Sequence, residues 1–434
     1  MEPSPPSQAA GSKPDLCPAG SYGWTPLALT ALLFFVIGFV TWLNGPLISF
    51  VRVSFSLDDK AAFLIPLVFY FSYFLFAIPS SWIVQCIGLK RSLSVALGIM
   101  ALGMACTGQF MATGLYHGAL AGLLSVGSGL ALLQTAVNSY VSFLGPLHKA
   151  AQRIAIMGIC NKFAGILAPI TLAYFVMGSI QDVAVHANQM TDPIARAALL
   201  HQFVQSIYWP YLAMALFMVL TAIAVSLSSL PDIHAPEKSG ASTRADTHSK
   251  FVTIVTSPRI LCGIIAMFLY VGVEVLAGDA IGTYAQDLGL SLNQTRFFTA
   301  LTLTGMLVGY CLGMLCTPRF CSQERYTLYC CIAGGFLSLM AFVAHGYGAV
   351  LCLALLGVAN AMIFPGLFPT VLKNTGALAP LVSALLVMAY CGGGVLPQLF
   401  VWLKTIFGFQ GVFTSLTLYG YGFIALYMRS NPAR

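Results

Sequence analysis

Three ionisable side chains lie deep inside apolar segments of this 434-residue chain: Lys162, Glu274 and Asp279. A charge within a lipid bilayer is costly, so residues of this kind usually have a function. We expect the two acids to take up protons or a cation, and Lys162 to bind a group of a solute or to control one of the acids. The alternative is a buried structural pair that joins two parts of the chain. The functional and the structural interpretation are both correct if the ion pair breaks and re-forms as the protein changes between two states.

Glu274 and Asp279 are five residues apart in one apolar segment. On an α-helix this spacing separates two side chains by about 140° around the axis, so they do not share a face. We therefore expect one acid to face a cavity while the other packs against a neighbouring helix.

Uncharged polar residues within other apolar segments predict the same cavity. An isolated amide could simply form a hydrogen bond between helices, but several together favour a polar cavity, and tyrosine rings suit stacking against a sugar or another flat polar molecule. The predicted solute-binding residues are Asn44, Gln134, Asn138, Asn161, Lys162, Tyr270, Asn360 and Tyr390.

The composition requires a membrane. Only 8% of the residues are charged and 58% are apolar, whereas a soluble domain carries roughly 25% charged residues. Twelve apolar segments are each long enough to cross a bilayer as a helix, so the predicted fold is an all-α membrane protein. The segments are residues 25–50, 60–84, 92–112, 116–144, 153–177, 207–229, 257–285, 294–316, 326–344, 347–372, 378–403 and 407–428.

The basic residues predict the orientation of these spans. Twelve spans place both termini on one side, and fourteen Lys and Arg residues fall on that side against five on the other. Because cytoplasmic loops are rich in Lys and Arg, both termini are predicted to be cytoplasmic.

The spans divide into two halves. We expect a cytoplasmic polar tail over residues 1–24, a six-helix half over 25–229, a cytoplasmic linker over 230–256, a second six-helix half over 257–428 and a short tail over 429–434. An offset of 230 residues aligns residues 127–145 with 357–375, and prolines and glycines in residues 365–369 and 392–397 allow close packing or a bend in two spans of the second half. Parallel six-span repeats joined by a linker are typical of the major facilitator superfamily.

Nothing in the sequence indicates an enzyme, a metal site, a cofactor or a nucleic-acid partner. The seven His residues lie in loops, tails or span ends, and the twelve Cys lie mostly in apolar segments as small packing residues. A membrane sensor built on the same fold stays as a remote alternative to a transporter.

Four segments resemble the fucose–proton symporter and glucose/galactose transporter family of that superfamily. They are residues 135–146 (TAVNSYVSFLGP), 270–274 (YVGVE), 364–370 (FPGLFPT) and 387–397 (VMAYCGGGVLP). The resemblance implies a secondary transporter of the bacterial inner membrane. It would work by alternating access, with proton-coupled uptake of a sugar or sugar-like solute.

The chain departs from this family at several polar positions. Gly45 stands where the symporters carry an acid, Gln134 stands where fucose-type members have Glu, and Lys162 replaces a serine. We therefore expect Glu274 or Asp279 to couple transport to a proton or a sodium ion. The rival solute is one with a carboxylate, such as an organic acid or a siderophore, bound by Lys162, and import or export is left open.

Overall fold

The computed structural model describes residues 24–143, 150–176, 180–228, 253–254, 256–317, 319–373, 375 and 378–431. These residues form helices, and twelve helical segments are long and apolar enough to cross a membrane, which confirms the predicted all-α fold. The predicted tails and the linker over 230–256 lie largely outside the described residues.

The first half contains α1 (Trp24–Thr41), α2 (Asn44–Ser54), α3 (Asp59–Ala62), α4 (Leu64–Ile87), α5 (Leu89–Ala112), α6 (Tyr116–Phe143), α7 (Ala150–Phe175), α8 (Ile180–Gln189), α9 (Pro193–Gln205) and α10 (Tyr208–Leu227). The second half contains α12 (Pro258–Asp279), α13 (Ile281–Asp287), α14 (Leu292–Thr295), α15 (Phe298–Cys316), α16 (Gln323–Val343), α17 (Tyr347–Asn360), α18 (Ile363–Leu372), α19 (Ala379–Met388), the 3₁₀ turn η3 (Ala389–Cys391), α20 (Gly392–Phe407) and α21 (Phe409–Ser430).

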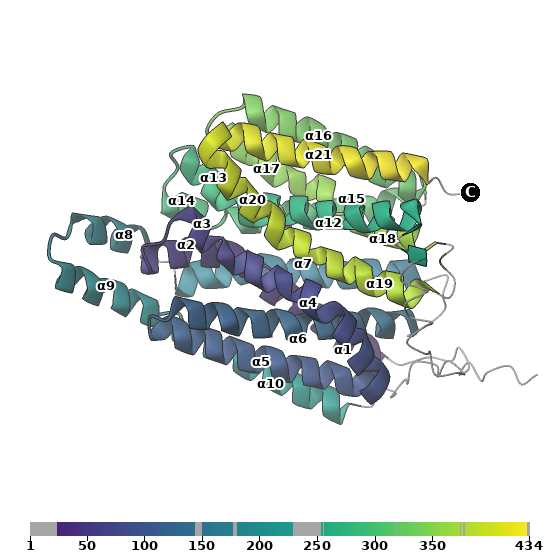
Figure 1. Ribbon diagram of the computed structural model, residues 1–434, viewed down its shortest axis with the longest axis horizontal. Helices are drawn as coiled ribbons and strands as arrows, with labels where there is room; N and C mark the ends of the chain where they lie inside the picture. Colours follow the sequence, from purple (N-terminus) through teal and green to yellow (C-terminus); the bar gives the residue numbers. More distant parts are fainter. Residues whose placement is uncertain are drawn as a thin grey trace, which may run out of the picture.

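The long helices run along the long axis of the molecule (Figure 1), with α5, α6 and α10 on one side and α16, α17 and α21 on the other. Within the first half, α5 packs on α6 and α10, and within the second, α16 packs on α17 and α21. Contacts between the halves come from α4 against α19 and α20, and from α7 against α15. Helices α4, α7, α15, α19 and α20 therefore form much of the contact between the halves.

Between the fifth and sixth apolar segments the chain forms a pair of helices rather than a plain loop. Helices α8 and α9 project from the left end of the bundle in Figure 1. The side chain of Asp192 accepts a hydrogen bond from the backbone N–H of Ile194, and Pro193 occupies the first helical position of α9. This is a strong start signal for a helix, although the segment is too polar to be a span by itself.

Several spans are broken where proline or glycine weakens the helix. Proline has no N–H to donate, and its ring displaces the carbonyl four residues earlier. Pro46 follows the break between α1 and α2, and Pro365 follows the break between α17 and α18. Three glycines at residues 392–394 follow η3, where α19 passes into α20. The breaks in spans 10 and 11 lie where the sequence allowed close packing or a bend, whereas the break in span 1 was not predicted.

Two glycines at equivalent positions of the halves allow close approaches between helices. A Cβ on Gly127 of α6 would lie 2.1 Å from Oγ of Ser72 on α4, and a Cβ on Gly357 of α17 would lie 2.1 Å from the carbonyl oxygen of Thr302 on α15. The offset of 230 residues aligns these two glycines. Small residues at such crossings bring backbones into contact, which is how membrane helices gain packing energy.

We expect Gly357→Ala to lower the melting temperature of the purified protein in detergent. The added methyl group meets backbone at α15, and overpacking of this kind typically costs about 1–3 kcal/mol. Gly422→Ala on α21 is the matched control, because a Cβ there meets no atom within 4 Å. Alanine is intrinsically the better helix former, so the control should melt no lower than the parent. Equal melting temperatures for both variants would contradict this packing account.

Candidate functional site

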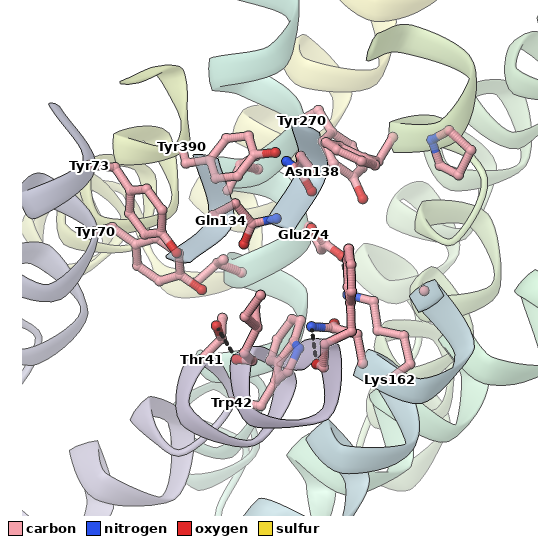
Figure 2. A pocket seen from close by; sticks show the side chains of 18 of the residues that line it. Thr41, Trp42, Tyr70, Tyr73, Gln134, Asn138, Lys162, Tyr270, Glu274 and Tyr390 are labelled. Carbon is pink, nitrogen blue, oxygen red and sulfur yellow. Dashed lines mark hydrogen bonds and ion pairs between the residues drawn. The ribbon is translucent and has the colours of Figure 1, made fainter. Parts of the chain in front are cut away.

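A cavity of about 130 Å³ lies between the two halves (Figure 2). Helices α1, α4, α6 and α7 contribute one side of its wall, and α12, α15, α18 and η3 contribute the other. Its lining residues are Phe34, Ile37, Thr41, Trp42, Tyr70, Tyr73, Gln134, Asn138, Gly158, Asn161, Lys162, Tyr270, Val271, Glu274, Val275, Tyr310, Phe364, Pro365 and Tyr390.

Most of the predicted solute-binding residues line this cavity: Gln134, Asn138, Asn161, Lys162, Tyr270 and Tyr390. The structure does not bring Asn44 and Asn360 to it. Nδ2 of Asn44 donates to the carbonyl of Thr41 at 3.2 Å, where α1 breaks. Oδ1 of Asn360 accepts a hydrogen bond of 2.9 Å from the hydroxyl of Tyr421. Asn360 thus forms the hydrogen bond between helices that was the alternative for a single amide, whereas Asn44 bonds to the backbone of its own span.

An ion pair crosses the cavity from one half to the other. Nζ of Lys162 on α7 lies 2.7 Å from Oε1 of Glu274 on α12, and the two side chains are only 9% and 11% exposed. Nζ also lies 4.7 Å from the ring centre of Trp42, an arrangement in which a cation is attracted to the face of the ring. Lys162 and Glu274 are the charged residues among those that line the cavity. Its walls therefore carry no net charge as long as both are ionised.

Aromatic rings form the other wall. Tyr73 stacks on Tyr70 with ring centres 6.3 Å apart and meets Tyr390 at 5.4 Å. Phe364 lies 6.2 Å from Tyr390 and 6.4 Å from Tyr270. Among the described residues the buried hydroxyl of Tyr390 has no hydrogen-bond partner. Flat rings with a free hydroxyl offer both stacking and hydrogen bonding to a small polar molecule.

Trp42, Tyr73 and Phe364 line the cavity although they were not predicted to do so. Each lies in an apolar segment, and there the sequence does not distinguish an aromatic residue that faces lipid from one that faces a cavity. Trp42 could have been found from Pro46, since a proline four residues later predicts a break at that point.

Asp279 lies away from the cavity, at the end of α12. Its side chain is almost fully buried, with the residue 2% exposed, and Oδ1 lies 2.9 Å from the point where a Cβ on Gly45 would be. Within the described part of the chain, neither carboxyl oxygen has a hydrogen-bond partner. The prediction that the two acids face different surroundings is confirmed.

A cluster of ions joins the halves at the end of the bundle where α3 and α13 lie (left in Figure 1). Asp59 of α3 lies 3.1 Å from Arg52 and 2.6 Å from Lys404 of α20, and Lys404 lies 2.7 Å from Asp287 of α13. Nη1 of Arg52 also donates to Oε1 of Gln286 at 2.9 Å. These contacts hold α2 and α3 against α13 and α20, so the halves are closed against each other at this end.

Comparisons with known proteins identify the class. The family model of the Major Facilitator Superfamily matches residues 30–397, and the chain belongs to that family. Together with the twelve spanning segments, this makes it a multi-pass membrane protein with the fold of the superfamily, as the sequence predicted.

Individual proteins within the superfamily are similar to this chain over most of its length. The chain is 26% identical over 410 residues to the glucose/galactose transporter of Brucella abortus biovar 1 (strain 9-941), covering 94% of each protein. It is 26% identical over 374 residues to the L-fucose-proton symporter of Escherichia coli (strain K12), covering 85% of this chain and 84% of that protein. The crystal structure of the transporter FucP in its outward conformation matches with a TM-score of 0.77 at 23% identity, covering 94% of this chain and 99% of FucP. The D-xylose-proton symporter matches the fold with a TM-score of 0.67 at 15% identity, covering 95% of this chain and 98% of that chain.

We expect Lys162→Met to destabilise the protein by about 3–5 kcal/mol, because it leaves Glu274 buried without its partner. Glu274→Gln should destabilise it for the converse reason. The double variant removes both charges and should recover most of the loss, measured as melting temperature in detergent. Lys373→Met, at an exposed lysine, is the matched control and should melt like the parent. Singles as stable as the parent, or losses that simply add in the double variant, would mean that the pair does not join the halves.

Proposed function

We propose that this chain is a secondary transporter that carries a small neutral polar solute, a sugar or sugar-like molecule, together with protons. The observation that carries the proposal is the cavity between the halves, in which Lys162 is already neutralised by Glu274. In transporters of this design the substrate binds near the midplane at the interface of the repeats, and rocking of the halves exposes it to each side in turn.

The shape and chemistry of the cavity favour a single small ring. A volume of about 130 Å³ is well below the roughly 300–1,000 Å³ of pockets that hold drug-sized ligands. The amides of Gln134 and Asn138 and the hydroxyls of Tyr270 and Tyr390 could bind sugar hydroxyls, while the ring faces of Tyr73 and Trp42 could cover the apolar face of a sugar. The names of the relatives, a glucose/galactose transporter and an L-fucose-proton symporter, support the same solute class.

A carboxylate-bearing solute is less well supported. To bind Lys162, its carboxylate would either share Nζ with Oε1 of Glu274, which lies 2.7 Å from Nζ, or displace that acid. Sharing would place two carboxylates on one buried cation, a net negative charge that is costly to bury. A displaced acid would be left buried and unpaired, at a cost of several kcal/mol. A neutral solute can bind without breaking the pair.

The same proposal assigns an orientation. We place both termini in the cytoplasm of a bacterium, with the ion cluster of Arg52, Asp59, Asp287 and Lys404 on the external side of the inner membrane. The excess of Lys and Arg on the side of the termini supports this placement. The structure then corresponds to a state that is closed to the outside.

In proteoliposomes with an inwardly directed proton gradient, we expect the purified protein to accumulate a labelled hexose above its equilibrium level. A protonophore should abolish the accumulation, because the gradient supplies the energy. A dicarboxylate at the same concentration should not compete with the hexose. Uptake of the dicarboxylate instead, or hexose binding without any flux, would refute the proposed solute or the transport function respectively.

Coupling is assigned to Glu274 or Asp279. The variant that loses the proton-carrying group, Glu274→Gln or Asp279→Asn, should lose accumulation driven by the gradient and keep counterflow exchange of the hexose. Exchange needs no net change in protonation, so it separates coupling from binding. Undiminished accumulation in both single variants would exclude both acids as the coupling groups.

The orientation is tested with reporter fusions. A reporter after Arg434 or within residues 235–250 should be cytoplasmic, and one within residues 182–200 should be external, because of the distribution of basic residues. An external signal from residues 235–250 would contradict the assignment.

A further inference from the structure

Asp279 is enclosed by both halves at a point where two spans break. It ends α12 at the break before α13, and Gly45 lies opposite it in the first turn of α2, just after the break in span 1. A Cβ on Gly45 would lie 2.9 Å from Oδ1 of Asp279 and 2.7 Å from Oγ1 of Thr299 on α15. The halves therefore meet at Gly45 with no room for a side chain, and this contact covers the carboxyl group.

The enclosed carboxyl group lacks what an ionised form would need. Its residue is 2% exposed, and neither oxygen has a hydrogen-bond partner within the described residues. The backbone amide of Gly45 faces it but does not meet the geometry of a hydrogen bond. Burial of an ionised carboxylate without donors or a paired cation costs many kcal/mol, whereas a carboxylic acid is far cheaper to bury.

The surrounding charges give the ionised form little support. The titratable side chains that interact with Asp279 are Glu274 on α12 and Tyr70 on α4, and neither is a cation. Lys162 of α7 is held by Glu274 at 2.7 Å. From α2 and α15, Gly45 and Thr299 bring no charge. The N-terminus of α2 favours a negative charge and the C-terminus of α12 disfavours it, so the two helix ends oppose each other.

We propose that Asp279 is a proton-binding site, separate from the solute cavity, that must be protonated before the external side of the transporter can close. Opening of the external side separates α2 from α12 and exposes the carboxyl group to external water, where it can exchange its proton. Closing packs Gly45 onto it and traps the proton. The assignment deepens the proposed function, on which its meaning as a coupling step rests, and leaves Glu274 as the partner of Lys162.

The test measures closure itself and uses no solute. Oγ of Ser49 on α2 lies 4.0 Å from the Cβ position of Gly282 on α13, across the same contact. Ser49 is partly buried there, so a cysteine at position 49 should react faster when this side opens. We would label Ser49→Cys in intact cells with a membrane-impermeant maleimide from about pH 5 to about pH 9, in medium without sodium. Ile194→Cys, at a site 80% exposed on α9, corrects for the pH dependence of thiol reactivity, and the parent chain corrects for the native cysteines.

The corrected labelling rate of Ser49→Cys should fall as the pH is lowered, because protons favour the closed state. For one proton bound on closing, the closed-to-open ratio changes by at most about tenfold per pH unit. Adding Asp279→Asn, which mimics the protonated acid, should leave labelling slow at every pH. Adding Gly45→Asp with Asp279→Gly places a carboxyl group in nearly the same space from the opposite helix, once Thr299 rotates its hydroxyl aside, and should restore the pH dependence.

Four results would overturn the proposal: labelling of Ser49→Cys that does not change with pH, a pH dependence that survives Asp279→Asn, one that is lost on Glu274→Gln, or closure that requires sodium. The pH dependence of Ser49→Cys labelling is measured with Asp279 intact, so it tests the proposal even if the Asp279 variants fail to fold. Labelling that follows the prediction while hexose uptake fails would refute the proposed solute and retain the proton site. Hexose uptake with labelling independent of pH would refute the proton site alone.

Discussion

The ion pair between Lys162 and Glu274 is the constraint on which the site depends. It places one charge from each half at 2.7 Å within the cavity, and neither charge could stay at that depth without the other. As long as it is intact, the cavity wall carries no net charge, and the aromatic rings and amides can select a neutral solute. The halves are also tied together at the level where that solute would bind.

The second acid meets a different constraint. Glu274 has a cation within reach, whereas Asp279 is covered by the backbone of Gly45 and has no donor among the described residues. The two carboxyl groups lie on one helix yet have different surroundings, because five residues turn them to different faces. Glu274 therefore joins the halves at the cavity, while Asp279 lies in the contact between α2 and α12, where we propose that it binds a proton. The ion cluster around Lys404 closes the same end of the bundle.

The twelve helical spans could be predicted almost completely from the sequence, because the bilayer requires long apolar helices that can be recognised one segment at a time. The bends in spans 10 and 11 followed from proline and glycine. The site could be predicted only in part. Lys162 and Glu274 could be singled out because they are ionisable residues deep inside apolar segments. Their pairing could not be predicted, because it depends on how α7 and α12 pack. Tyr73 and Phe364 carry no signal that separates a cavity wall from a lipid-facing surface, and only the break that Pro46 predicts points to Trp42. Asn44 and Asn360 form hydrogen bonds within the protein and do not line the cavity.

The central claim is that a neutral ring solute binds beside Trp42 and the Lys162–Glu274 pair. It is tested most directly by the fluorescence of Trp42 in a protein whose other tryptophans, Trp24, Trp82, Trp209 and Trp402, are replaced with Phe. A ligand that packs against the ring changes its polarity and solvent contact. We predict a saturable change in Trp42 emission on titration with a hexose and no change with a dicarboxylate. A response to the dicarboxylate alone, or to neither compound, would contradict the account.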